Sequence, residues 1–125
     1  MNSMVIHAVT SQLSDAISFV SSCAAPVTKD IWKIELAVEE ALVNIIEHGY
    51  CDESQKIHIQ CNTTSNMFTV QIADTARPFN PTTYSGPSEE PFERGRGIRL
   101  MRAVTDRMEY YRDDQINILT LKKLI

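Results

Sequence analysis

The stretch EALVNIIEHGY, from Glu40 to Tyr50, decides how the rest of this 125-residue chain can be arranged. At 100° per residue, apolar side chains within it and just before it gather on one side of a helix predicted from about Asp30 to His48. These side chains are Ile31, Ile34, Val38, Ala41, Leu42 and Ile45. The length of the apolar stripe predicts a helix that lies against the core of the domain.

Three polar residues follow the edge of this apolar side, each four positions from the last: Glu40, Asn44 and His48. Groups at such a border are partly buried. A carboxylate there can be held in place with an adjusted pKa, and an amide oxygen can bind a hard cation such as Mg²⁺. Polar residues at helical spacing are more often a solvated flank, and this helix taken alone favours that plainer interpretation.

The composition limits the classes of protein to consider. A chain of 125 residues with 43% hydrophobic content suits one domain with a real core. Twelve basic and sixteen acidic side chains give a net charge of −4, which argues against nucleic acid as the main partner. All seven arginines lie after residue 76, so we expect any anion site in the second half of the chain. They are Arg77, Arg94, Arg96, Arg99, Arg102, Arg107 and Arg112.

The chain shows no signal for a membrane or for a disulfide framework. No apolar run approaches the roughly 20 residues that span a bilayer, and the start of the chain lacks the pattern of a signal peptide. Three cysteines, Cys23, Cys51 and Cys61, fit a reducing compartment. His58 and Cys61 lie on a predicted strand and would point to opposite faces, so structural zinc is not expected. We therefore expect a cytoplasmic protein without a membrane partner.

The remaining pattern predicts further helices and two hairpins. Helices are expected at about 12–22, 30–48 and 98–104, and strands at 56–61, 67–73, 107–111 and 116–122, with a short first strand at 5–9. This order predicts an α/β sandwich with helices on one face of a mixed, mostly antiparallel sheet. Because neither a repeat nor a linker interrupts the chain, residues 1–125 are expected to form a single domain.

Two segments place polar groups near the ends of predicted strands. In IADTARPFNP, Asp74 ends an apolar strand, where a carboxylate can accept a hydrogen bond from the exocyclic amine of a base in an otherwise apolar pocket. In INILTLKK, Thr120 could hydrogen-bond beside Asp74. Each residue also has a plainer interpretation, a turn-starting aspartate and a strand threonine of good β-propensity.

A third segment, ERGRGIRL, is rich in glycine and arginine. Gly95 and Gly97 are predicted to precede a helix, so that bare backbone N–H groups could meet a phosphate with Arg94, Arg96 or Arg99 nearby. A flexible hinge with ordinary surface arginines is an equally good interpretation. The region from 77 to 97 holds four prolines and three glycines with little periodicity, which predicts a functional loop of the lid type.

In order and spacing, these segments resemble the ATP-binding boxes of the GHKL ATPase superfamily, and most closely its small anti-sigma-factor serine kinases. EALVNIIEHGY is similar to the N-box and DTARPFNP to the D-x-G-x-P-F-D-P box. GRGIRLMRAVTDRMEYYR, together with NILTL, is similar to the glycine box and the closing hairpin. The resemblance covers residues 30–123 and implies the Bergerat-type fold, a two-layer α/β sandwich.

The resemblance also implies a role for each matching residue. Glu40 would be the general base, Asn44 a ligand of Mg²⁺ and Asp74 the residue that reads adenine, with Thr120 supporting Asp74. These roles agree with phosphoryl transfer, in which a protein mainly positions groups and stabilises charge.

The phosphate side of the site is implied in the same way. Gly95 and Gly97, with Arg94, would lie against the phosphates of ATP, and residues 81–94 would form the lid. Ala76 stands beside the implied adenine site, where the family usually has glycine. If the turn at Ala76 requires positive φ or a close approach of the base, the methyl group would narrow the pocket.

Members of this family phosphorylate a serine on a small antagonist protein and alternatively sequester a sigma factor. The resemblance therefore implies an ATP- and Mg²⁺-dependent protein-serine kinase that acts as a partner-switching, anti-sigma-type regulator. Its substrate would be an anti-anti-sigma protein, with a sigma factor as a further candidate partner and a homodimer left open. The alternative is a catalytically weak or inactive binding module of the same fold that sequesters a regulatory partner. Glu40, which a purely structural domain would not need, favours the kinase.

Overall fold

The computed structural model describes residues 2–49, 52–83 and 92–125, with only the backbone described for 92–95. In these ranges five strands form one sheet in the order β1-β2-β3-β5-β4, and every pairing is antiparallel. The elements are β1 (Asn2–His7), α1 (Leu13–Ala24), α2 (Ile31–His48), β2 (Lys56–Thr63), β3 (Met67–Asp74), α3 (Phe92–Val104), β4 (Arg107–Asp113) and β5 (Ile116–Leu124).

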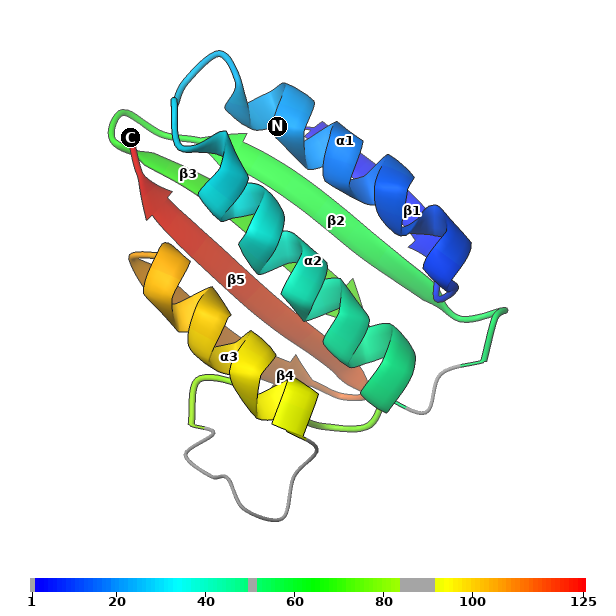
Figure 1. Cartoon of the computed structure of the whole chain (residues 1–125). Helices are drawn as coiled ribbons and strands as arrows, with labels where there is room; N and C mark the ends of the chain where they lie inside the picture. The colour runs from blue at the N-terminus through cyan, green and yellow to red at the C-terminus, as the bar shows by residue number, and fades with distance from the viewer. Residues whose placement is uncertain (1, 50–51, 84–91) are drawn as a thin grey trace.

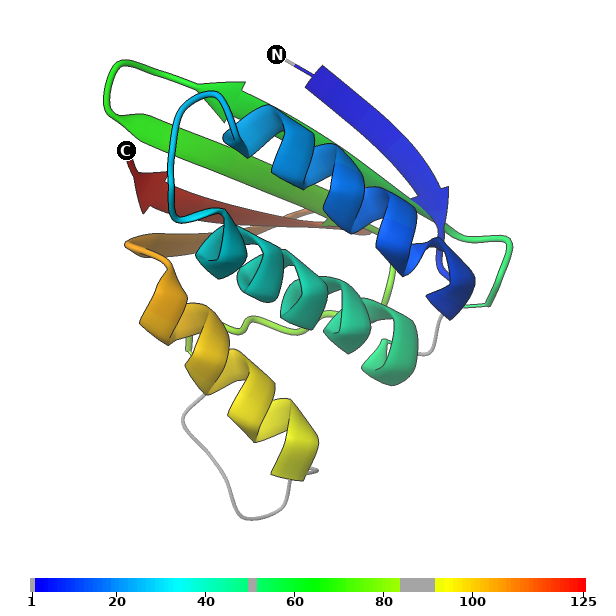
Figure 2. The same cartoon turned by 45° about the horizontal axis from the view of Figure 1, so that its top comes forward.

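The helices all lie on one face of the sheet, so the molecule has two layers (Figure 1). Figure 2 shows the helical layer and the sheet from a second direction. This arrangement confirms the predicted α/β sandwich with helices on one face, and the sheet of the described residues is antiparallel throughout rather than mixed. It follows from the sequence pattern, because β2 and β3 alternate buried and exposed residues with the period of two that a sheet with one covered face requires.

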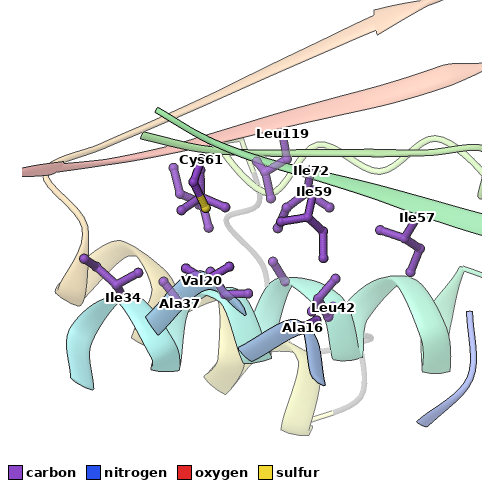
Figure 3. Close-up of a cluster of buried hydrophobic side chains, with 14 of the residues drawn as sticks. Ala16, Val20, Ile34, Ala37, Leu42, Ile57, Ile59, Cys61, Ile72 and Leu119 are labelled. Atoms are coloured by element: carbon purple, nitrogen blue, oxygen red, sulfur yellow. The ribbon is translucent and has the colours of Figure 1, made fainter. Parts of the chain in front are cut away.

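The core fills the space between the two layers (Figure 3). Helix α2 contributes the buried side of its apolar stripe, including Val38 and Leu42, which are both fully buried. The sheet contributes the inward residues of its central strands, among them Ile59 and Ile72. The predicted apolar face of α2 is therefore confirmed, and its packing fixes the rotation of that helix above the sheet.

Two elements begin at least three residues away from the start predicted from the sequence, whereas the other boundaries agree within about two residues. Strand β1 occupies Asn2–His7 rather than 5–9, because the chain enters a short 3-10 turn at Thr10–Gln12. Helix α3 begins at Phe92 rather than at 98. Its added turns contain two glycines, each of which costs about 1 kcal/mol relative to alanine in a helix, so the pattern predicted a loop there.

Within the described ranges, none of the helices combines the length and the apolar character needed to cross a bilayer. The predicted lid, 81–94, falls largely on residues 84–91, which lie outside the described part of the chain.

Paired isoleucine substitutions test the core. Ile72 on β3 is fully buried, whereas Ile116 on β5 is 43% exposed. We expect Ile72→Ala to lower the free energy of unfolding by about 2–5 kcal/mol, because it leaves a cavity between the layers. The same change at Ile116 should cost less than about 1 kcal/mol. Chemical denaturation of both variants measures the difference, and equal losses would contradict the placement of Ile72 in the core.

Candidate functional site

A pocket opens where β3 ends and β5 begins, beside α2. About 470 Å³ of it is not filled by atoms, its open mouth included. Its lining is mainly apolar and comes from α2, α3, β5 and the segment after β3: Ala41, Ile45, Phe79, Pro81, Met101 and Leu119. Asn44, Asp74 and Asn117 supply polar groups within this lining. A mostly apolar pocket with a few convergent polar groups is typical of a small-molecule site.

Asp74 is the buried charged group of this pocket. It is the last residue of β3, where the register pairs it with Asn117 on β5, and it is only 6% exposed. Its Oδ1 accepts hydrogen bonds from the Ala76 N–H at 2.8 Å and from Asn117 Nδ2 at 3.0 Å. Burial raises the pKa of the Asp74 carboxyl, and these hydrogen bonds and the nearby Arg112 only partly oppose the rise.

Asn117 holds this end of the pocket together, and the sequence analysis missed it. Its Nδ2 also donates to the Ala76 carbonyl at 2.9 Å. Its Oδ1 accepts from the Tyr110 hydroxyl at 2.5 Å and from an Arg112 Nη at 2.7 Å. One signal could have found it, since Asn117 is a polar residue in phase with the inward-facing Leu119 and Leu121 of the same strand.

Thr120 does not take the position predicted for it. Side chains alternate along a strand, so Thr120 lies on the opposite face of β5 from Asn117 and Leu119. Its neighbours across the sheet are Gln71 and Glu109. The prediction that Thr120 hydrogen-bonds beside Asp74 is therefore wrong, and Asn117 makes that contact.

Glu40 and Asn44 lie one turn apart on α2, both half-buried, as the edge of the apolar stripe predicts. Asn44 lines the pocket. Glu40 lies where α2 packs against α3, so close to Gly97 that a methyl group there would overlap its carboxylate. Burial, together with Glu39 and Glu47, raises the pKa of Glu40, which makes it a better proton acceptor near neutral pH.

The two glycines of ERGRG lie inside α3 rather than before it, which corrects the prediction. Within a helix, the N–H of Gly97 bonds to the carbonyl four residues earlier, so in this conformation it is not free for a phosphate. The same close packing against Glu40 explains why position 97 needs glycine. The side chain of Arg94 lies outside the described part of the chain, so its predicted contact with phosphate stays a prediction.

Ala76 forms part of the pocket wall without backbone strain. Among the described non-glycine residues, only Asp114 has positive φ, so the turn at Ala76 does not need the glycine conformation. The Ala76 methyl lies against Gly49, where an added Cβ would come within 2.7 Å of it. Gly49 therefore provides the space that the alanine side chain occupies.

The chain belongs to the histidine kinase-like ATPase domain family, whose model matches residues 6–123. The matched range includes α2, β3, α3 and β5, the elements that form the pocket. The family resemblance drawn from the sequence segments is confirmed.

Similar proteins of known name include two bacterial kinases. Serine-protein kinase RsbW from Bacillus thuringiensis is 26% identical over 102 residues, which cover 74% of this chain and 64% of RsbW. Serine/threonine-protein kinase BtrW from Bordetella bronchiseptica is 31% identical over 94 residues, which cover 70% of this chain and 66% of BtrW. The chain thus spans slightly under two thirds of the length of these relatives.

Solved structures with the same fold include the RsbU and RsbW domains of Rv1364c from Mycobacterium tuberculosis. That structure has a TM-score of 0.65 at 14% identity and covers 99% of this chain and 33% of its own. The histidine kinase AdeS from Acinetobacter baumannii has a TM-score of 0.56 at 13% identity and covers 99% of this chain and 68% of its own. At these identities the likeness establishes the fold.

Replacing Asp74 by asparagine should stabilise the protein at neutral pH. Because the pKa of Asp74 is raised on folding, the folded state penalises its charged form above that pKa, and the penalty disappears as the pH falls toward the ordinary value. We therefore expect Asp74→Asn to raise the free energy of unfolding at pH 7, with the gain fading on acidification through the raised pKa. Denaturant unfolding of wild type and variant across this pH range measures the effect.

Asp106 supplies a control of opposite sign. Hydrogen bonds from the Leu124 N–H and the Lys123 ammonium lower its pKa, so its charged form stabilises the fold at neutral pH. Asp106→Asn should lower the free energy of unfolding at pH 7. A loss of stability in Asp74→Asn at pH 7 would show that burial does not penalise the Asp74 carboxylate.

Proposed function

We propose that this protein is an ATP- and Mg²⁺-dependent protein-serine kinase. One observation carries the proposal: Asn44 lines the pocket in which Asp74 is buried, and Glu40 lies one turn from Asn44 on α2, where that helix packs against α3. A proton acceptor, a hard oxygen ligand and a hydrogen-bond acceptor suited to a base thus occur together. Membership of the histidine kinase-like ATPase domain family supports nucleotide as the ligand.

The residues present fit the two groups that the proposal requires. Asp74 offers a buried acceptor in an apolar pocket, which suits the exocyclic amine of adenine. Asn44 offers one amide oxygen, which suits Mg²⁺ when the remaining ligands are phosphate oxygens and water. When bound, Mg²⁺ would neutralise phosphate charge. Glu40 would accept the proton of the attacking serine hydroxyl, and its raised pKa suits that role.

The proposed substrate is a small antagonist protein of the anti-anti-sigma type, phosphorylated on serine in the cytoplasm. A sigma factor is the second partner, bound in alternation with the antagonist. The relative RsbW is named a serine-protein kinase and BtrW a serine/threonine-protein kinase, and these names support phosphoryl transfer to a protein hydroxyl as the reaction. The charge of the chain, −4, supports a protein rather than a nucleic acid as the partner.

A second candidate function is a binding module of the same fold with little phosphoryl transfer. The observation that favours it is the helical conformation of Gly95 and Gly97, which occupies the N–H of Gly97 within α3. A module of this kind would bind its partner without needing Glu40 as a base. The two candidates therefore differ in what happens when Glu40 is changed.

Replacing Glu40 by glutamine tests the kinase directly. The variant keeps the shape of the side chain but removes the base, so we expect Mg·ATP affinity to stay within about threefold while phosphorylation falls by about 10²–10⁴-fold. Isothermal calorimetry and phosphate transfer from labelled ATP to antagonist candidates from neighbouring genes give the two measurements. Glu39→Gln, at the exposed neighbouring position, is the matched control. It removes only a coulombic contribution to the pKa of Glu40 that is smaller than the effect of burial, and it should keep most of its activity.

Three further results bear on the same experiment. Asn44→Ala should weaken Mg·ATP binding, because it removes the proposed metal ligand. Wild-type activity should decline on acidification through a pKa that lies above the ordinary value of a glutamate, since protonated Glu40 cannot accept a proton. If wild type binds no ATP at millimolar concentration, the kinase is excluded and the binding module takes its place.

A methyl group at position 97 should impair transfer through Glu40. Gly97→Ala adds a Cβ that overlaps the Glu40 carboxylate, so either the carboxylate or α3 must shift. We expect the phosphorylation rate to fall by about tenfold or more, since a misplaced base loses its positioning. Alanine favours a helix over glycine by about 1 kcal/mol, so the lower phosphorylation rate is not expected to come from loss of helical structure in α3. Full activity in this variant would contradict the placement of Glu40 at the reaction centre.

A further inference from the structure

Two cysteines meet between α1 and β2, away from the pocket described above. Cys61 lies on the inward face of β2 and is 2% exposed, and Cys23, in the last turn of α1, is half-buried against the core. The two thiols are in hydrogen-bonding contact. Neither cysteine lines the pocket that holds Asp74. The proposed kinase reaction therefore leaves both thiols unused.

The strand register and the helix periodicity both bring these thiols together. Asn2 on β1 pairs directly with Cys61, and its side-chain Nδ2 donates to the Cys23 sulfur at 3.6 Å. Cys61 points from the sheet toward the helical layer, which includes Val20 of α1 (Figure 3). Cys23 follows Val20 by three residues and so lies on the same face of α1. A disulfide requires two cysteines whose side chains face each other, and this pair meets that requirement.

The two thiols differ in access and in protonation. Burial raises the pKa of the Cys61 thiol to about 12, and Cys23 adds to the rise through its charge and its hydrogen bond. Cys61 is therefore protonated at neutral pH, whereas the form that reacts with oxidants is the thiolate. Cys23 is the more exposed of the two. An oxidant from the solvent should thus react first at Cys23.

We propose that Cys23 and Cys61 form an oxidant-sensitive dithiol, in which hydrogen peroxide oxidises Cys23 and Cys61 then closes a disulfide between α1 and β2. In the first step the Cys23 sulfur attacks the peroxide and the O–O bond breaks, which yields the sulfenic acid and one water. In the second step the Cys61 sulfur attacks the Cys23 sulfur and the S–O bond breaks. The leaving hydroxide takes the Cys61 proton and forms the second water. The two thiols lose two electrons in total, and the peroxide gains them.

The first step prepares the second. Conversion of Cys23 to the protonated sulfenic acid removes the thiolate charge that opposes ionisation of Cys61, so the buried thiol becomes a better nucleophile. In a reducing compartment such a disulfide is transient, because a thiol–disulfide reductase returns it to the dithiol by exchange. The pair would then respond to peroxide reversibly. This inference does not depend on the kinase activity proposed above.

Peptide mapping of the peroxide-treated wild-type protein tests the proposal. Lys29 and Lys56 place the three cysteines in three different tryptic peptides, so mass spectrometry after alkylation of free thiols identifies the linked pair. We expect the folded protein to lose two hydrogen atoms in mass and to link Cys23 to Cys61. Protein unfolded in urea is the control. Cys51 and Cys61 are ten residues apart and Cys23 and Cys61 are 38 apart, so in the unfolded chain the shorter loop should close preferentially.

Two variants in a Cys51→Ser background separate the roles of the thiols. In Cys61→Ala, oxidation of Cys23 should stop at the sulfenic acid, which dimedone labels. In Cys23→Ala, Cys61 should stay a free thiol at the same peroxide concentration. The oxidised parent should also unfold on the order of 10 °C above the reduced parent, because the cross-link restricts the unfolded chain. Peroxide should leave the unfolding temperature of Cys23→Ala unchanged.

The mapping result decides the question. A Cys23–Cys61 linkage as the main product of the folded protein, with a different main product in urea, supports the dithiol. The proposal is overturned if Cys23 is oxidised to the sulfinic acid while Cys61 stays free, if the folded protein links through Cys51, or if neither thiol reacts. The mapping uses wild type, so a variant that does not fold leaves the decision intact. Nucleotide binding is not measured, so failure of the kinase and failure of the dithiol are distinguishable.

Discussion

The burial of one face of α2 against the sheet is the constraint on which the other features depend. Val38 and Leu42 are fully buried, so the helix cannot rotate without exposing them to water. This rotation places Glu40 and Asn44 at the border of the core, where one faces α3 and the other the pocket. The positions of the proposed base and metal ligand are thus set by hydrophobic packing, and local polar interactions adjust them.

A second constraint is the burial of the Asp74 carboxylate. Desolvation penalises its charge, and the raised pKa of Asp74 shows that the surrounding hydrogen bonds do not fully compensate. Ionisable groups with shifted pKa values gather at functional sites, so the buried carboxylate agrees with the binding role proposed for Asp74. The network through Asn117, Tyr110 and Arg112 keeps this buried polar cluster satisfied, which limits the cost to the carboxylate itself.

The sequence predicted those parts of the structure that depend on local periodicity. The stripe of α2 and the alternation of β3 both follow from patterns within one element, and both are confirmed. The start of α3 was missed because Gly95 and Gly97 oppose helix formation locally, whereas tertiary packing against α2 overrides that preference. The error at Thr120 has a different origin. The alternation of β5 separates Thr120 from the inward-facing Leu119 and Leu121. Which inward residue lies beside Asp74, however, depends on a register between strands more than forty residues apart, and the alternation alone does not fix that register.

The alanine at position 76 shows how a site can keep its shape when a local motif changes. The family's usual glycine there suggests a need for space or for positive φ, yet the turn has no positive φ and still directs its N–H to Asp74. The space comes instead from Gly49 at the end of α2, twenty-seven residues earlier in the sequence, where any side chain would meet the Ala76 methyl. The space is needed at the contact between the two segments, so a glycine on either segment can provide it. A motif considered in one segment alone can therefore predict a steric clash that does not occur, because the opposite segment has no side chain at the point of contact.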